Sequence, residues 1–243
     1  MQESSALQTK AGVDTTIGEI VAADYRTARV FEAHGIDFCC GGKVALAAVC
    51  EEKGIDPGVL LQEIETASSA QVDRSQNYTA WELPFLADYI VNTHHAYLKD
   101  NDGQIAAYAR KIAAVHGANH PEVVEIAAIF SKIAIDMAAH LREEEEVFFP
   151  AVKRADAAGK TGNVLEAQDR EVIEASLAKL GREHEAIGDA IHTIRHLSKG
   201  YLLPGDACTT FKVTYQKLKE FEDDLHKHVH LENNILFPKA AAL

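Results

Sequence analysis

Two segments of the chain repeat one pattern, in which a histidine is followed four residues later by a glutamate and then by Phe-Pro. The first segment is HLREEEEVFFP at 140–150, and the second is HVHLENNILFP at 228–238. Residues i and i+4 lie on one face of an α-helix, so the histidine and glutamate of each copy can approach one metal ion. A lone pair of this kind is common on solvated helices, but a gapless repeat that includes both Phe-Pro ends favours a metal site.

Two other helical segments match the repeat more weakly. HHAYL at 94–98 and EHEAI at 183–187 each contain a histidine at the matching place. The pattern predicts two helix pairs related by a pseudo-twofold axis, in which every helix supplies at least one inward ligand. The predicted ligand set is four imidazoles and two carboxylates: His94, His140, Glu144, His184, His228 and Glu232.

Adjacent residues compete with two of these ligands. His95 points about 100° away from His94 around a regular helix, so it is kept as an alternative ligand or as a group that supports one. The repeat selects Glu144 among four consecutive glutamates, because only this position is also a glutamate in the second copy. The other three are expected to form a solvated acidic rim: Glu143, Glu145 and Glu146.

The predicted donor set indicates which metal it holds. Imidazole and carboxylate without thiolate suit iron, manganese or zinc. Structural zinc more often occupies one closed site with cysteine, and ferritin-like sites use more glutamate. Two carboxylates that each bridge two metals leave two histidines for each ion. The set therefore predicts a non-haem di-iron centre with coordination positions open to a small ligand.

Composition and spacing predict an all-α protein. Ala, Leu, Ile, Glu and Lys dominate, and Pro is sparse, with 6 residues. A small helical domain is expected over 1–70, with a helix at 16–35, then a polar linker at 71–78 and a bundle at 79–243. Short connections favour an antiparallel up-down-up-down four-helix bundle. Its helices are expected at about 79–116, 121–154, 164–198 and 207–234, with DAAGKTGN (156–163) as a loop.

Charge and hydropathy exclude several classes of protein. The net charge of −13 and the lack of a basic cluster argue against nucleic-acid binding. No apolar run is long enough to span a membrane, and the first residues do not read as a signal peptide. Four cysteines, two of them adjacent, do not form a disulfide framework, so a cytoplasmic location is expected.

At these motifs the chain resembles the repair-of-iron-centres (RIC) proteins, a hemerythrin-like di-iron family. The resemblance rests on HHAYL, HLREEEEVFFP, REHEAIG, ACTT (207–210), HVHLENNILFPKA and IDFCCGGK (36–43). It implies the six ligands predicted above and two iron ions in an oxo- and carboxylate-bridged centre. It further implies protection or repair of damaged iron–sulfur clusters, with nitric oxide (NO) or O2 as small ligand and damaged iron–sulfur proteins as iron recipients.

The resemblance leaves the activity open between three alternatives. The protein is expected to donate iron, to act enzymatically as an NO reductase that forms N2O, or to bind NO or O2 as a scavenger or sensor. Either a monomer or a homodimer is compatible with the sequence.

The adjacent cysteines Cys39 and Cys40 are candidates for a redox or iron-transfer role. They precede a predicted helix, whose N-terminus is expected to lower a thiol pKa. The alternative is that one of them packs in a small core. Cys50 and Cys208 are expected to be buried small hydrophobic residues.

Overall fold

The computed structural model describes residues 11–69 and 76–243. Within these ranges the protein is helical, and its only extended pairing is an isolated bridge between Thr16 and Ala45. The chain divides into two compact units. The first comprises Met1–Glu82 together with His230–Pro238, and the second comprises Leu83–Val229 with Lys239–Leu243. Most of the predicted linker (71–75) lies outside the described residues.

In the first unit, the described residues 11–69 form four short α-helices. The helix predicted over 16–35 is interrupted, because the extended backbone of Asp24 ends α1 and its side chain accepts a hydrogen bond from the amide of Arg26. Thr16 and Glu19 form a capping box at the start of α1, and Asp56 caps α4. The elements are α1 (Ile17–Ala23), η1 (Tyr25–Thr27), α2 (Ala28–Ala33), α3 (Leu46–Lys53) and α4 (Pro57–Ala67).

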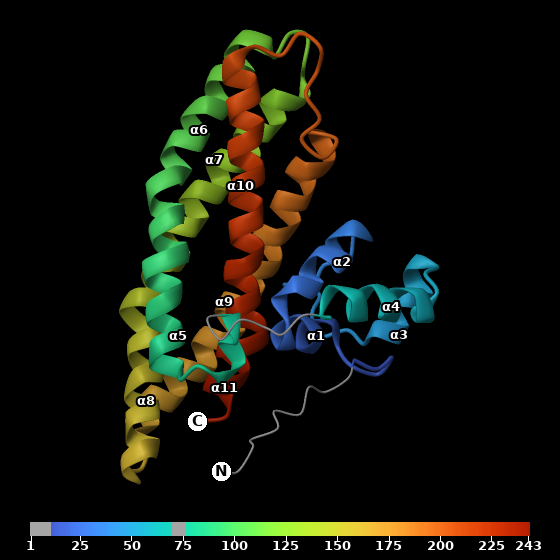
Figure 1. Cartoon of the computed structure of the whole chain (residues 1–243). Helices are drawn as coiled ribbons and strands as arrows, with labels where there is room; N and C mark the ends of the chain where they lie inside the picture. Colours follow the sequence, from blue (N-terminus) through green and yellow to red (C-terminus); the bar gives the residue numbers. More distant parts are fainter. Residues whose placement is uncertain (1–10, 70–75) are drawn as a thin grey trace. The chain divides into compact units, whose positions relative to one another are not determined.

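The second unit contains long helices that lie alongside one another (Figure 1). After a short 3-10 turn, η3 (Tyr78–Ala80), the chain forms α5 (Leu83–Ile90), α6 (Ala96–His116), α7 (Glu122–Glu143), α8 (Phe149–Thr161), α9 (Ala167–Leu197) and α10 (Thr209–Leu231). Packing of α6 on α7, which a short turn joins, and of α7 on α9 confirms the predicted all-α bundle.

One helix boundary in the bundle was predicted wrongly. The segment DAAGKTGN (156–163) is not a loop, because α8 continues through it as far as Thr161. Alanines favour the helix, and Gly159 lies within it at a modest cost. The helix ends where Gly162 adopts a left-handed conformation with φ +71°.

Three of the long helices contain a π-helical turn. These turns are η4 (Val91–His95) between α5 and α6, η5 (Glu144–Phe148) between α7 and α8, and η6 (Glu232–Leu236) between α10 and α11 (Phe237–Ala241). A π turn closes over one residue more than a regular α-helical turn, so it shifts which residues face the core downstream, and such turns occur frequently at functional sites. Each of the three turns begins or ends at a candidate metal ligand.

Aromatic and aliphatic side chains form the core of the bundle. Phe130 on α7 meets Phe221 on α10 with ring centroids 4.9 Å apart, and both side chains are fully buried. Among the described residues, no helix combines the length and the apolar character needed to cross a membrane.

Candidate metal centre

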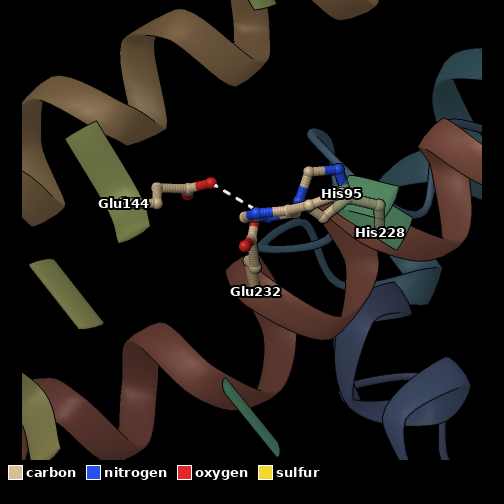
Figure 2. A group of neighbouring side chains, drawn as sticks. All are labelled: His95, Glu144, His228 and Glu232. Carbon is tan, nitrogen blue, oxygen red and sulfur yellow. Dashed lines mark ion pairs between the residues drawn. The ribbon is translucent and has the colours of Figure 1, made fainter. Parts of the chain in front are cut away.

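Two groups of buried side chains share the same pair of carboxylates. One group is His95, Glu144, His228 and Glu232, and the other is His140, Glu144, His184 and Glu232. In each group the potential ligand atoms all lie within 4.8 Å of one another. Figure 2 shows the first group, with the carboxylate of Glu144 directed at His95. The shared carboxylates define two neighbouring positions for cations, each with two imidazoles.

The distances within the groups fit metal ligands. Nε2 of His140 lies 3.0 Å from Nε2 of His184 and 3.4 Å from Oε1 of Glu144. Nε2 of His95 lies 3.4 Å from Oε2 of Glu144. The Nε2 atoms of His95 and His140 therefore face the carboxylate of Glu144, and Nε2 of His184 faces Nε2 of His140, as expected where histidines bind a metal through Nε2.

Burial and charge also favour cations here. Glu144 and Glu232 are both fully buried. Placing two ionised carboxylates together inside a helix bundle is costly unless positive charge compensates them. Cations bound between the four imidazoles and the two carboxylates would supply this charge, and the donor set is one that suits iron.

The structure brings five of the six predicted ligands into these groups and places His95 where His94 was expected. His94 instead turns Nδ1 toward Asp224, with 2.9 Å between Nδ1 and Oδ1. Its ring stacks on that of His228 with centroids 6.0 Å apart, so it lies beside the centre without joining it. The π turn η4 ends at His95 and changes the helical phase at this point. The match between His94 and His184 assumed regular helices in both places, and α9 contains no such turn.

Two outer carboxylates orient two of the candidate ligand histidines. Nδ1 of His95 lies 2.7 Å from Oε1 of Glu145, and Nδ1 of His140 lies 2.8 Å from Oε2 of Glu183. A carboxylate on the second ring nitrogen fixes the tautomer in which Nε2 carries the lone pair that binds a metal. The sequence missed both of these partners, although Glu183 directly precedes His184.

Glu145 is therefore more than part of a solvated acidic rim. Both of its oxygens accept hydrogen bonds from the ammonium group of Lys99, at 2.6 and 2.7 Å. Partial burial raises the pKa of Glu145, but its bonds to Lys99 and His95 outweigh this effect and hold the pKa below its usual value. The carboxylate thus stays ionised and continues to accept from His95.

The adjacent cysteines lie in a separate group with Asp37. Sγ of Cys39 is 3.8 Å from Sγ of Cys40 and 3.2 Å from Oδ1 of Asp37. The following helix begins only at Leu46, so the expected helix N-terminus is not beside these thiols. The pKa of Cys39 is raised rather than lowered, because its sulfur hydrogen-bonds to Cys40, is buried and faces the charge of Asp37.

Two asparagines of η6 hold the cysteine loop within the first unit. The amide of Asn233 donates to the carbonyl of Cys39 at 3.1 Å, and that of Asn234 donates to the carbonyl of Phe38 at 3.0 Å. A Cβ atom on Gly42 would collide with the side-chain oxygen of Asn234. The loop is thus attached to the helical turn that begins at Glu232.

The other two cysteines differ from each other. Cys50 is buried, as predicted. Cys208 is exposed, which corrects the prediction, and its Sγ lies 3.2 Å from Nε2 of His116. Hydrogen bonds from the amide of Phe211 and from His116 lower the pKa of this thiol.

The helix bundle and its buried His/Glu groups define a cation-binding protein of the hemerythrin class. In agreement, the family described as "Hemerythrin HHE cation binding domain" matches residues 86–240. A second family, ScdA_N, which is described as a domain of unknown function, matches residues 13–68. Membership of the hemerythrin class implies that the bundle binds iron.

Curated relatives extend over almost the whole chain. The iron-sulfur cluster repair protein ScdA of Staphylococcus epidermidis is 32% identical over 223 residues, which cover 91% of this chain and 96% of the relative. The iron-sulfur cluster repair protein YtfE of Salmonella typhimurium is 29% identical over 230 residues, covering 94% and 97%. The chain belongs to this family of iron-sulfur cluster repair proteins.

Proposed function

We propose that this protein repairs damaged iron–sulfur clusters and that it does so with a di-iron centre bridged by Glu144 and Glu232. One observation carries the proposal: both carboxylates occur in both buried groups, and each group adds two histidines. Two cations that share two carboxylates lie close together, as in other two-metal sites. The family names of the relatives supply the cellular role.

The residues of the chain prepare the site for this role. Glu145 and Glu183 keep two imidazoles in the tautomer that binds metal through Nε2. Four imidazoles and two carboxylates leave coordination positions unfilled, which gives a small molecule access to the ions. When bound, two ferrous ions supply sites for NO or O2 and a store of iron for a damaged cluster.

Iron content and transfer test the proposal. Protein prepared anaerobically with ferrous iron should hold about two iron ions per chain. Glu144→Ala and Glu232→Ala should each lose most of this iron, because each removes a ligand from both positions. Glu146→Ala is the matched control, since Glu146 is exposed and should leave the iron content unchanged. One zinc ion and no iron in the unaltered protein would overturn the proposal.

The repair step itself is tested with a recipient protein whose iron–sulfur cluster has been damaged by NO. Donation predicts that iron leaves the bundle while the cluster absorbance of the recipient returns. The Glu146→Ala control should donate as the unaltered chain does. Recovery of the recipient with the iron-depleted Glu144→Ala protein would contradict donation from the centre.

The second candidate function is reduction of NO. The observation that favours it is the closeness of the two cation positions, because two NO molecules need adjacent sites to couple. The balanced reaction takes two NO, two electrons and two protons to N2O and water, and two bound ferrous ions would supply the two electrons. A single turnover under anaerobic conditions distinguishes the functions: N2O with iron retained favours reduction, and iron loss with cluster recovery favours donation.

The other predicted properties belong to the same proposal. Binding of NO or O2 as a scavenger or sensor, an oxo bridge between the irons, the cytoplasmic location and the monomeric or homodimeric state all stay predictions. The role of Cys39 and Cys40 in redox chemistry or iron transfer also stays a prediction. The grouping of Asp37 with the two thiols bears on iron transfer.

A further inference from the structure

We infer that Asp37, Cys39 and Cys40 form a second metal site, which takes one thiophilic divalent cation such as Fe²⁺ or Zn²⁺. The potential ligand atoms of these three residues lie within 4.8 Å of one another. The inference goes beyond the proposed repair activity, because it assigns a separate site to the first unit of the chain. One part of the inference rests on the proposed function, namely that the site binds iron temporarily while the iron is transferred.

The spacing of the sulfurs matches a tetrahedral ion. Two thiolates that are each bound about 2.3 Å from a tetrahedral cation lie about 3.8 Å apart. Sγ of Cys39 and Sγ of Cys40 are 3.8 Å apart, and they are not joined in a disulfide. The carboxylate of Asp37 lies on the same side, with Oδ1 3.2 Å from Sγ of Cys39. The three donors therefore need little rearrangement to bind one ion.

Backbone hydrogen bonds hold Asp37 in this position. Its Oδ1 accepts from the amides of Cys39 and Cys40, both at 2.9 Å. These bonds fix the carboxylate relative to the two thiols, because donor and acceptor belong to the same short loop. A binding site that is ordered before the ion arrives loses less conformational entropy on binding.

The π turn η6 also holds the cysteine loop in place. Asn233 and Asn234 donate to the carbonyls of Cys39 and Phe38, so the loop is fixed from a second direction. The turn that supplies these amides also carries Glu232, a proposed bridging ligand. Within the first unit, the cysteine loop and a ligand of the iron centre are thus attached to the same helical turn.

The number of ligands favours transfer over permanent storage. Structural sites for tetrahedral ions are usually closed by four protein ligands, whereas three protein ligands leave one position open. Cys40 is partly exposed while Cys39 is buried, so an incoming ligand can approach from the side of Cys40. The open position allows a thiolate of a second protein to join the ion before the loop releases it.

Cobalt(II) titration of the full-length, reduced protein under anaerobic conditions tests this site. A thiolate ligand gives cobalt a charge-transfer absorption in the near ultraviolet, and the His/Glu groups of the bundle cannot produce it. We expect this absorption to saturate at about one ion per chain, and we expect Cys39→Ser with Cys40→Ser to abolish it. Asp37→Asn should weaken cobalt binding at least about tenfold, the lower end of the cost of losing even an outer partner of a metal ligand.

Asp56→Asn is the matched control for Asp37→Asn. Asp56 also accepts two backbone amides with Oδ1, those of Gly58 and Val59, but it caps α4 and is not one of the donors grouped with Cys39 and Cys40. Asparagine retains an oxygen acceptor in both variants, so the loops should keep their fold, which circular dichroism checks. Normal cobalt binding by Asp56→Asn together with weak binding by Asp37→Asn supports the assignment.

Three results would overturn the inference: no thiolate absorption with the unaltered protein, unchanged affinity in Asp37→Asn, or equal weakening in both asparagine variants. The iron content of the bundle is measured on the same samples. Failure of the cobalt signal with about two irons still bound would refute the second site alone. Failure to hold iron in the bundle would instead refute the proposed function.

Discussion

Replacement of the adjacent histidines His94 and His95, one at a time, tests which of them binds iron. His95→Ala removes one of the two imidazoles at one cation position, whereas His94→Ala removes a ring that lies beside the centre. Both side chains are almost completely buried, so the two variants make cavities of the same kind. A difference in iron content between them therefore reports coordination and not packing.

The expected magnitude follows from the contacts. Loss of an outer partner of a ligand costs about 10–100-fold in metal affinity, and loss of the ligand itself costs more. Iron in the His95→Ala protein should therefore fall from about two ions to about one after exposure to a chelator. The centre of His94→Ala should stay full. The His94→Ala substitution should instead lower the free energy of unfolding by about 1–3 kcal/mol, because Asp224 loses its hydrogen-bond partner.

The assay combines iron determination after dialysis against a chelator with thermal unfolding of the apo-proteins. His94→Ala should unfold at a lower temperature than the unaltered chain and yet hold as much iron. Full iron occupancy in His95→Ala would refute the assignment. So would an equal loss of iron from both variants, because such a result would mean that packing around the histidines, and not coordination, retains the metal.

Two further predictions concern groups around the two sites, and a third concerns the exposed thiol of Cys208. Glu145→Gln should lower iron affinity about 10–100-fold, because a neutral amide holds and polarises the imidazole of His95 more weakly than a carboxylate does, while Glu146→Gln should leave it unchanged, as chelator competition would show. Asn234→Asp should loosen the cysteine loop, because a carboxylate cannot donate to its carbonyl, and hydrogen exchange at residues 38–42 should then speed up. Cys208 should react with iodoacetamide at neutral pH faster than an ordinary thiol, because its lowered pKa gives more thiolate; His116→Ala should slow this reaction, and an unchanged rate would contradict the role of the imidazole.

The fold and five of the grouped ligand residues follow from the sequence because they depend on helical periodicity. The repeat places His140 with Glu144 and His228 with Glu232 at i and i+4, a spacing that every α-helix brings to one face. The same comparison separates Glu144 from its neighbouring glutamates. Such inferences need only the chain's own pattern, so they do not depend on how distant side chains pack.

The position of His95 could not be predicted in this way. The His95 side chain points toward the buried carboxylates because of the π turn at Val91–His95, and no pattern in the sequence predicts such a turn. The role of Glu145 was hidden for a related reason, since its partners His95 and Lys99 lie on a different helix. Contacts between helices require the three-dimensional arrangement, which periodicity alone does not provide.

The two copies of the repeat differ most where their surroundings differ. Glu145 and Asn233 occupy equivalent positions, as do Glu146 and Asn234. In the first copy a carboxylate is required, because Glu145 must accept from a ligand imidazole. In the second copy an amide is required, because the side chains must donate to the carbonyls of the cysteine loop, and a carboxylate has no proton to donate. The two copies thus supply equivalent His and Glu side chains to the buried groups, while the residues that follow have different roles: in one copy Glu145 orients His95, and in the other Asn233 and Asn234 hold the cysteine loop.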